Sequence, residues 1–242
     1  MKNVALVLGL IMVLFVASCK KGNEPEPTIH TQQIDLSISY KVDEESFMEN
    51  CMMYQNKAGN EYSITKLVYY ISQVSLIKAD SGKVLLKNYH YVDAMNSSSN
   101  LLVLKDVPVG NYIGISFNIG LDSAQNISDG LPATTDNVNM KWPNPMGGGY
   151  HFLKLEGYYK DTTATPGYAM HLGTNSCLVP IKLFKPINVT TDSKIPLGLV
   201  MNINEWYKNP TTFDFNKDGN YIMGNAAAMK KITDNGRDVF SF

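Results

Sequence analysis

The sequence predicts an all-β fold, an antiparallel β-sandwich with a short helical segment near its C-terminal end. Segments of alternating apolar and polar residues recur along the chain, separated by Gly, Pro, Asn and Asp, as in half-exposed strands joined by turns. Tyrosine (14 residues) and glycine (18) are plentiful, and no charged heptad pattern occurs, which favours strands over helical bundles. With 242 residues, of which 44% are hydrophobic, the chain is long enough to bury one sizeable core.

The first strands follow a loop-and-hairpin pattern. Residues 34–42, "IDLSISYKV", place Ile34, Leu36, Ile38 and Tyr40 on one face of a strand. Residues 51–59 lack a period and predict a loop. Residues 62–94 predict two strands joined at the turn "ADSG", and residues 101–122 predict two more around Pro108 and Gly110, where proline and glycine favour a turn.

The second half contains a long irregular stretch before further strands. Residues 122–149 are rich in Asn, Asp, Gly and Pro, and a loop of this length in a compact domain is usually functional or disordered. Strands are predicted from residue 150, at residues 168–173, and at residues 195–207, where the strand runs into a short helix. The segment "YIMGNAAAMKKITDNG" predicts a helix that ends at Asn235 and Gly236.

The N-terminal residues predict export and lipid anchoring. Lys2 precedes an apolar segment at residues 4–17, which is too short to span a membrane comfortably and ends in Ala17-Ser18-Cys19. We expect cleavage before Cys19 and lipid on its thiol; the alternative is an ordinary cleavage site with an incidental cysteine. Residues 1–18 are then a signal peptide, 19–33 a flexible stalk and 34–242 the folded domain, held in the cell envelope at the outer membrane.

Two further cysteines, Cys51 and Cys177, lie in the domain. Export into an oxidising compartment permits a disulfide between them. Free buried thiols and soft metal ligands are the competing interpretations.

Composition and motifs argue against several classes of function. The net charge of −1 gives no basis for nucleic-acid binding. No G-x-S-x-G, H-E-x-x-H or phosphate-binding glycine loop occurs, so we do not expect an enzyme. A hydrolase with carboxylates outside any linear motif is a third, weaker hypothesis.

The histidines offer candidate metal ligands. The chain has 4 of them, of which His30 falls in the stalk and His90 on the exposed side of a strand. His151 shares strand parity with Leu153 and Leu155, and His171 follows Met170. Imidazole and thioether donors suit copper. Structural histidines and a methionine-rich core are the alternative.

Several segments together resemble the MbnP-like family of copper-binding proteins associated with methanobactin systems. They are quoted in chain order: "KLVYYISQVSLIKADSGKVLLKNYHYVD", "DVPVGNYIGISFNIGLDSAQN", "MKWPNPMGGGYHFLKLEG", "MHLGT" and "YIMGNAAAMKKITDNGRDVF". The likeness covers about residues 34–240. It implies an exported β-sandwich, and in some members copper held by histidines together with a tryptophan that a di-haem, peroxidase-like partner oxidises to kynurenine.

Carried over by position, the resemblance makes Trp142 the possible kynurenine precursor and His171 a copper ligand. His151 is the second candidate, and Met170 is placed with them. Asn144 departs from the pattern, because many relatives have a second aromatic residue there. The first hypothesis is therefore a non-catalytic, lipid-anchored protein that sequesters or transfers copper. The second is a metal-free β-sandwich lipoprotein for adhesion or ligand binding.

A separate pattern near the C-terminus has the form of a calcium loop. Its alternating oxygen donors precede a glycine, and they are Asp214, Asn216, Asp218 and Asn220. The twelfth position is Asn225 in place of a bidentate glutamate. The alternative is a plain turn that caps a helix.

Overall fold

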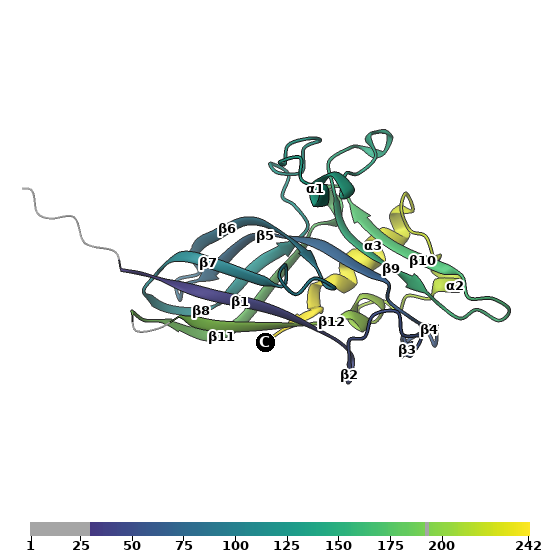
Figure 1. Cartoon of the computed structure of the whole chain (residues 1–242), viewed down its shortest axis with the longest axis horizontal. Helices are drawn as coiled ribbons and strands as arrows, with labels where there is room; N and C mark the ends of the chain where they lie inside the picture. Colours follow the sequence, from purple (N-terminus) through teal and green to yellow (C-terminus); the bar gives the residue numbers. More distant parts are fainter. Residues whose placement is uncertain (1–29, 192–193) are drawn as a thin grey trace, which may run out of the picture.

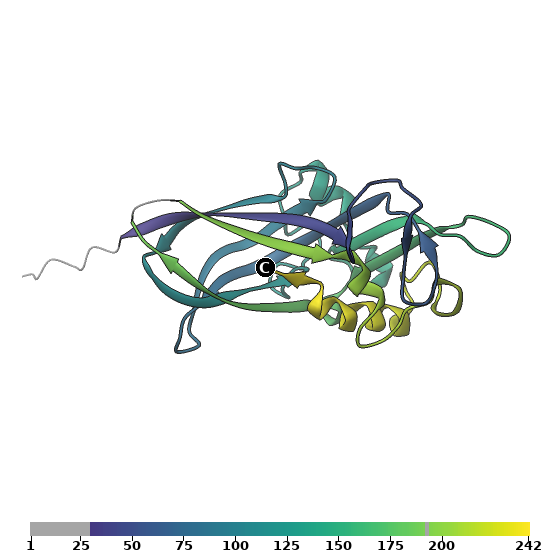
Figure 2. The same cartoon turned by 90° about the horizontal axis from the view of Figure 1, so that it is seen from below.

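The computed structural model describes residues 30–191 and 194–242. Two β-sheets enclose one continuous apolar core, and helix α3 (Ala226–Asn235) packs against strand β10 near the C-terminus (Figures 1 and 2). This confirms the expected all-β sandwich with a short C-terminal helical segment.

The smaller of the two sheets joins the two ends of the domain. Its strands are β1 (Thr31–Val42), β2 (Glu45–Ser46), β7 (Leu101–Pro108), β12 (Ile195–Asn202) and β13 (Phe240–Ser241). β1 and β12 pair in parallel, whereas β2 and β7 pair with β1 in antiparallel fashion. β1 starts at Thr31, before the expected domain start at Ile34, because Thr31 and Gln32 pair with the end of β7.

The larger sheet carries the candidate site. Its strands are β5 (Lys66–Ile77), β6 (Lys83–Asp93), β8 (Gly110–Ile119), β9 (His151–Tyr158), β10 (Gly167–Gly173) and β11 (Val179–Val189). All of its pairings are antiparallel. β6 covers one edge of β5, while β9 and β8 pair with successive stretches of it. This central position explains why nearly the whole apolar run of β5 is buried.

Short elements connect the sheets. β3 (Tyr54–Gln55) and β4 (Glu61–Tyr62) form a small hairpin in a region expected to begin as a loop. The remaining elements are α1 (Thr135–Asn139), α2 (Phe215–Asp218) and the 3-10 helices η1 (Asn144–Met146), η2 (Asn175–Cys177), η3 (Ile203–Tyr207) and η4 (Gly236–Asp238). α1 and η1 therefore interrupt the stretch 122–149 that lacked a clear pattern.

The C-terminal helix has the expected end. The side chain of Asn225 accepts a hydrogen bond from the backbone N–H of Ala228, and Gly236 caps the other end of α3. In residues 30–191 and 194–242, no helix has the length and apolar character that a membrane crossing requires.

Candidate metal centre

Two histidines meet at one end of the β9–β10 pair. The ring centroids of His151 and His171 lie 5.1 Å apart, with an angle of 88° between their planes. His151 is the first residue of β9, and His171 lies near the end of β10, so the antiparallel pairing brings them together. The two strands lie side by side in Figure 1.

A bulge in this pairing decides which way His151 faces. Leu172 pairs with Leu153, but the next residue, Gly173, pairs with His151, so Phe152 has no partner in the register. The expected shared parity of His151 with Leu153 is therefore wrong. Instead its ring contacts His171, whose own register partner is Lys154.

His171 is held by a carboxylate. Its Nε2 lies 3.0 Å from Oε1 of Glu156, and Nζ of Lys66 lies 3.1 Å from Oε2 of the same glutamate. The hydrogen bond from His171, followed by the contacts with Lys66, lowers the pKa of Glu156 to about 2 against the opposing effect of burial. Because a carboxylate accepts, Nε2 of His171 donates the proton, and Nδ1 is the nitrogen that would carry the lone pair in a neutral ring.

His151 is held by the backbone. Its Nδ1 lies 3.2 Å from the carbonyl oxygen of Met140, which only accepts, so Nδ1 donates and Nε2 keeps the lone pair. Only 5% of His151 is exposed. Burial, with smaller contributions from the charges of Lys154 and His171, lowers its pKa to about 3. The imidazole is therefore neutral at physiological pH, as a metal ligand must be.

The pKa of His151 has a consequence for stability. In the unfolded chain this imidazole takes up a proton at about pH 6.5, whereas in the folded protein it does so only at about pH 3. Between these values the unfolded state binds more protons, so the free energy of unfolding falls as the pH falls. In urea titrations, the stability advantage of the wild type over His151→Gln is expected to shrink between about pH 7 and about pH 4. An advantage that stays constant across this range would contradict the assignment.

Trp142 packs on the other side of His151. Their ring centroids lie 4.7 Å apart in an edge-on arrangement. The indole N–H donates to the carbonyl oxygen of Met146 at 3.1 Å, and the backbone N–H of Trp142 donates to Gly149. Gly147 turns the chain after η1 with a φ of 108°, a conformation that favours glycine. The Pro- and Gly-rich loop thus holds the indole against the histidine pair.

Gly173 makes room for this indole. A Cβ at Gly173 would lie 2.2 Å from Cε3 of Trp142, 2.5 Å from its Cδ2 and 2.7 Å from its Cζ3. Gly173→Ala is therefore expected to displace Trp142 from His151 and to lower the free energy of unfolding by about 1–3 kcal/mol. The measurement is Trp fluorescence together with urea denaturation. Unchanged fluorescence and stability would show that the packing between Trp142 and Gly173 is loose.

Met170 does not belong to this cluster. It precedes His171 on β10, and neighbouring residues of a strand face opposite sides of the sheet. Met170 is completely buried, while the side chain of His171 is 18% exposed. Its expected place beside His171 is therefore wrong, because closeness in sequence is not closeness on one face.

The ligand set within the described residues is small. Across residues 30–191 and 194–242, no three His, Cys, Asp or Glu side chains gather in a group that would hold a metal ion. Glu156 contacts the nitrogen of His171 that faces away from the available lone pair, so it orients a ligand and does not add one. Two imidazole nitrogens, Nε2 of His151 and Nδ1 of His171, remain as donors that suit copper.

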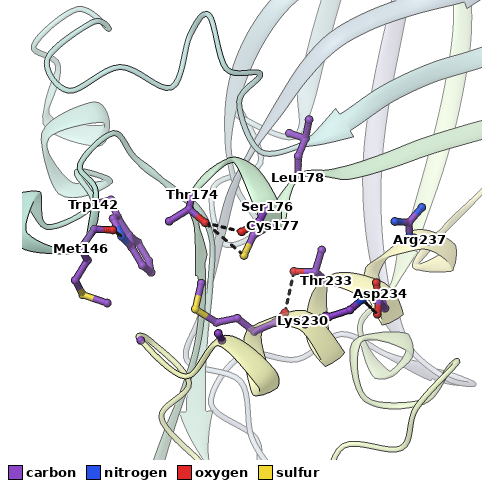
Figure 3. Close-up of a pocket in the computed structure, with 13 residues that line it drawn as sticks. Trp142, Met146, Thr174, Ser176, Cys177, Leu178, Lys230, Thr233, Asp234 and Arg237 are labelled. Atoms are coloured by element: carbon purple, nitrogen blue, oxygen red, sulfur yellow. Dashed lines mark hydrogen bonds and ion pairs between the residues drawn. The ribbon is translucent and has the colours of Figure 1, made fainter.

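A cavity of about 650 Å³ opens beside Trp142 (Figure 3). Its wall combines apolar side chains, including Met146, Leu178 and Met229, with the hydroxyl of Thr174 and the charged Arg237. A volume of this size accepts a small organic molecule. Trp142 therefore separates the histidine pair from this cavity.

The two domain cysteines are not paired. Cys51 and Cys177 are both free thiols, Cys51 partly exposed in the loop after β2 and Cys177 buried in η2. Of the interpretations that the sequence left open for this pair, the structure thus has free thiols and no disulfide. Cys177 also lines the cavity beside Trp142, where the hydroxyl of Thr174 lies 3.9 Å from its sulfur.

The residues of the candidate calcium loop are engaged in other contacts. Asp214 caps α2 by accepting from the backbone of Asn216, whose own side chain accepts from Tyr159. Asp218 pairs with Lys231 at 2.5 Å, and Asn220 donates to the carbonyl of Gly167. These contacts match the alternative of a helix-capping turn, although the helix that is capped is α2. Calcium binding stays a prediction.

Sequence inspection missed Glu156 and Lys66 as parts of the site. Glu156 lies inside the segment "FLKLEG", two residues after Lys154, so these two side chains face the same side of β9. His171 pairs with Lys154 in the register and therefore faces that side as well. His90 lies near the end of β6 and is half-buried. Its Nε2 lies 2.8 Å from the carbonyl oxygen of Ser99. His30 is exposed at the start of the described chain. Cys19 and the signal peptide lie outside the described residues.

Comparisons with known proteins support the family resemblance. The sequence profile of the MbnP family matches residues 31–224. The solved structure of MbnP from Methylosinus trichosporium superposes with a TM-score of 0.54, at 11% sequence identity, over 77% of this chain and 80% of that one. At such low identity this second likeness concerns the fold. No curated protein matches this chain in sequence.

Because the family profile spans most of the domain, the chain belongs to the MbnP family.

Proposed function

We propose that this MbnP family member binds one copper ion between His151 and His171 and acts in sequestration or transfer of copper, without catalysis. The observation that carries the proposal is the meeting of two imidazole rings at the end of β9 and β10. In each ring one nitrogen is fixed by an acceptor oxygen, which leaves the other nitrogen to bind the metal. This is the arrangement in which outer oxygens orient metal-binding histidines.

The donor set fits copper better than calcium or magnesium. Imidazole nitrogen suits copper, whereas calcium and magnesium prefer oxygen. A copper ion bound here would supply a redox-active centre beside Trp142, whose ring already contacts His151. Oxidation of Trp142 to kynurenine by a di-haem, peroxidase-like partner is part of the proposal. The indole is only 2% exposed, so such a partner would touch little of its surface.

Lipid anchoring at Cys19 completes the proposal. The part of the expected stalk (residues 19–33) that precedes β1 would hold the domain away from the outer membrane, on its periplasmic or outer face. The near-neutral charge of the chain supports neither nucleic-acid binding nor a polybasic membrane contact.

The experiment that tests the proposal is copper stoichiometry on the domain lacking Cys19. The protein is loaded with Cu(I), dialysed against a competing chelator and analysed for metal. About one copper per chain is expected to remain. No retention would contradict copper binding by the unmodified chain, and the mass of the peptide containing Trp142, measured on protein from its native host, would then test for kynurenine.

A second candidate function rests on the cavity beside Trp142. Its volume of about 650 Å³ and its mixed apolar and polar wall suit a small organic ligand. Together with Asn144, which replaces the second aromatic residue, this favours a metal-free ligand-binding lipoprotein if copper is not retained. A thermal shift with a small-molecule library on the copper-free domain would test it.

A further inference from the structure

Strand β6 has an edge that no strand covers in the described part of the chain. One edge of β6 pairs with β5 along nearly its whole length, and no register partner lies on its other edge (Figure 1). The next strand, β7, belongs to the smaller sheet and pairs with β1. An edge strand exposes unpaired N–H and C=O groups, which are a template for another strand.

The hydrogen bonds at one end of β6 show which main-chain groups point outward. Tyr91 lies opposite Tyr70, whose carbonyl oxygen accepts from Gly120 on the other side of β5, so this pair exchanges no ladder hydrogen bonds. The N–H and C=O of Tyr91 therefore point away from β5. Those of Asp93 do so as well, because both contact the hydroxyl of Ser99 at 2.9 Å.

The other end of β6 gives the same alternation. The N–H of Lys78 donates to the carbonyl oxygen of Gly82 at 2.8 Å, so the main-chain groups of Lys83 point outward. Leu86 has no register partner on β5, yet counting from either end selects the odd-numbered residues. Between residues 83 and 93, four outward positions have no main-chain hydrogen-bond partner within the described residues, namely Leu85, Lys87, Tyr89 and Tyr91.

A groove follows this free edge. It has a volume of about 600 Å³ and is lined by residues 85–91 alone, all of them consecutive residues of β6. Because no other element contributes to its wall, the groove is open on the side where a further strand would lie. Leu85, at one end of the groove, is 51% exposed and would be covered by such a strand.

We propose that β6 pairs with β6 of a second copy of this chain, in antiparallel fashion around a twofold axis at Asn88. The four free positions lie symmetrically about Asn88, so this register matches all of them with one another. Leu85 then lies opposite Tyr91 of the second copy, and Lys87 lies opposite Tyr89. These pairs and their symmetry mates form about eight main-chain hydrogen bonds, and the larger sheets of the two copies become continuous.

Charge complementarity favours a second copy over an unrelated strand. The same register places Lys83 opposite Asp93 of the second copy, and the twofold axis repeats this pair. Neither side chain forms an ion pair among the described residues of one chain. A register centred one residue earlier, on Lys87, would place this lysine opposite itself, which is unfavourable. The free positions and the charges therefore select the same register.

The proposed interface lies away from the histidine pair. β6 and β9 lie on opposite edges of β5, since Val68 has Asp93 as its partner in β6 and Lys154 as its partner in β9. Each copy would therefore carry its histidines on the side of β5 that faces away from the shared strands. Dimerisation does not depend on copper binding at that pair.

The first test is a disulfide across the twofold axis, made in the full-length protein in detergent with an excess of micelles over chains. In a Cys51→Ser background, Asn88→Cys is expected to give a cross-linked dimer on oxidation with diamide. The reason is that directly opposite residues of this kind have Cα atoms about 4.5 Å apart, within the range of a disulfide. The matched control is Leu85→Cys, whose two copies would lie about 20 Å apart. Equal cross-linking of the two variants, or none of Asn88→Cys, would overturn the proposal.

The second test blocks the outer edge of β6 without disturbing the inner one. Lys87→Pro removes an N–H that points away from β5, and proline is tolerated at such edge positions. In sedimentation velocity of the full-length protein at about 0.1 mM, the wild type is expected to be a dimer and Lys87→Pro a monomer. Urea denaturation checks that the variant is folded. A wild type that stays monomeric, or a folded Lys87→Pro that still dimerises, would contradict the pairing.

The third test changes one charge and leaves the backbone intact. Lys83→Glu places two negative side chains opposite each other at each end of the interface, so the dissociation constant of the dimer is expected to rise about 10-fold. The matched control is Lys182→Glu, the same change at an exposed lysine on β11, which β5 and β8 separate from β6. Its dissociation constant is expected to stay within about 2-fold of the wild type. Equal effects of the two variants would show general charge repulsion and would overturn the register with Lys83 opposite Asp93.

Discussion

Replacing His171 with alanine is expected to abolish the retention of copper against a competing chelator. His171 supplies one of only two imidazole nitrogens that remain free at the candidate centre, and its ring lies 5.1 Å from that of His151. A single remaining imidazole cannot hold copper against a chelator. The measurement is the metal content of His171→Ala after dialysis, compared with about one copper per chain in the wild type. Retention equal to the wild type would remove His171 from the ligand set.

Two neighbouring variants distinguish ligand loss from a general disturbance of the strand. Lys154→Ala changes the register partner of His171 without touching a donor nitrogen, so copper retention is expected to persist. Glu156→Gln keeps the shape of the carboxylate that orients His171 but removes its charge, and copper affinity is expected to fall by about 10–100-fold. If Lys154→Ala lost copper as completely as His171→Ala, the effect would be one of folding and not of ligation.

The fold was predictable because its signals are local. The hairpin β5–β6 follows from two apolar runs around a turn, and its register joins Ile77 to Lys83 next to the turn at residues 79–82. The helix α3 ends where Asn235 and Gly236 predicted. Such signals need only a short window of sequence, since turn and cap residues act on their immediate neighbours. The parallel pairing of β1 with β12 carries no such signal, because it joins opposite ends of the chain.

The candidate site was predictable only in part. The sequence singles out His151, His171 and Trp142, and the structure places their rings in contact. The bulge at Phe152 that turns His151 toward His171 depends on how β9 pairs with β10, which strand alternation alone does not reveal. Glu156 was missed for the same reason, since its role arises across the strand pair and not along the sequence.

Substituting Gly157 with alanine is expected to destabilise the domain by about 3 kcal/mol. A Cβ at Gly157 would lie 1.9 Å from the carbonyl oxygen of Ser63, a backbone atom that cannot move without shifting the segment between β4 and β5. The same carbonyl accepts a hydrogen bond from the hydroxyl of Tyr168 at 2.9 Å, so the methyl group would also break that contact. Tyr168 stacks on Phe215 within the aromatic core, which spreads the strain.

The measurement is urea denaturation of Gly157→Ala beside a matched glycine. Gly198→Ala is the control, because a Cβ there would meet only the hydroxyl of Ser37 at 3.8 Å, an ordinary contact. Its stability is expected to change by less than about 1 kcal/mol. Gly157 directly follows Glu156, so displacement of β9 at this point would also loosen the carboxylate that orients His171. Equal stabilities of the two variants would show that β9 and the segment around Ser63 separate easily, and the rigid support ascribed to the copper centre would then be wrong.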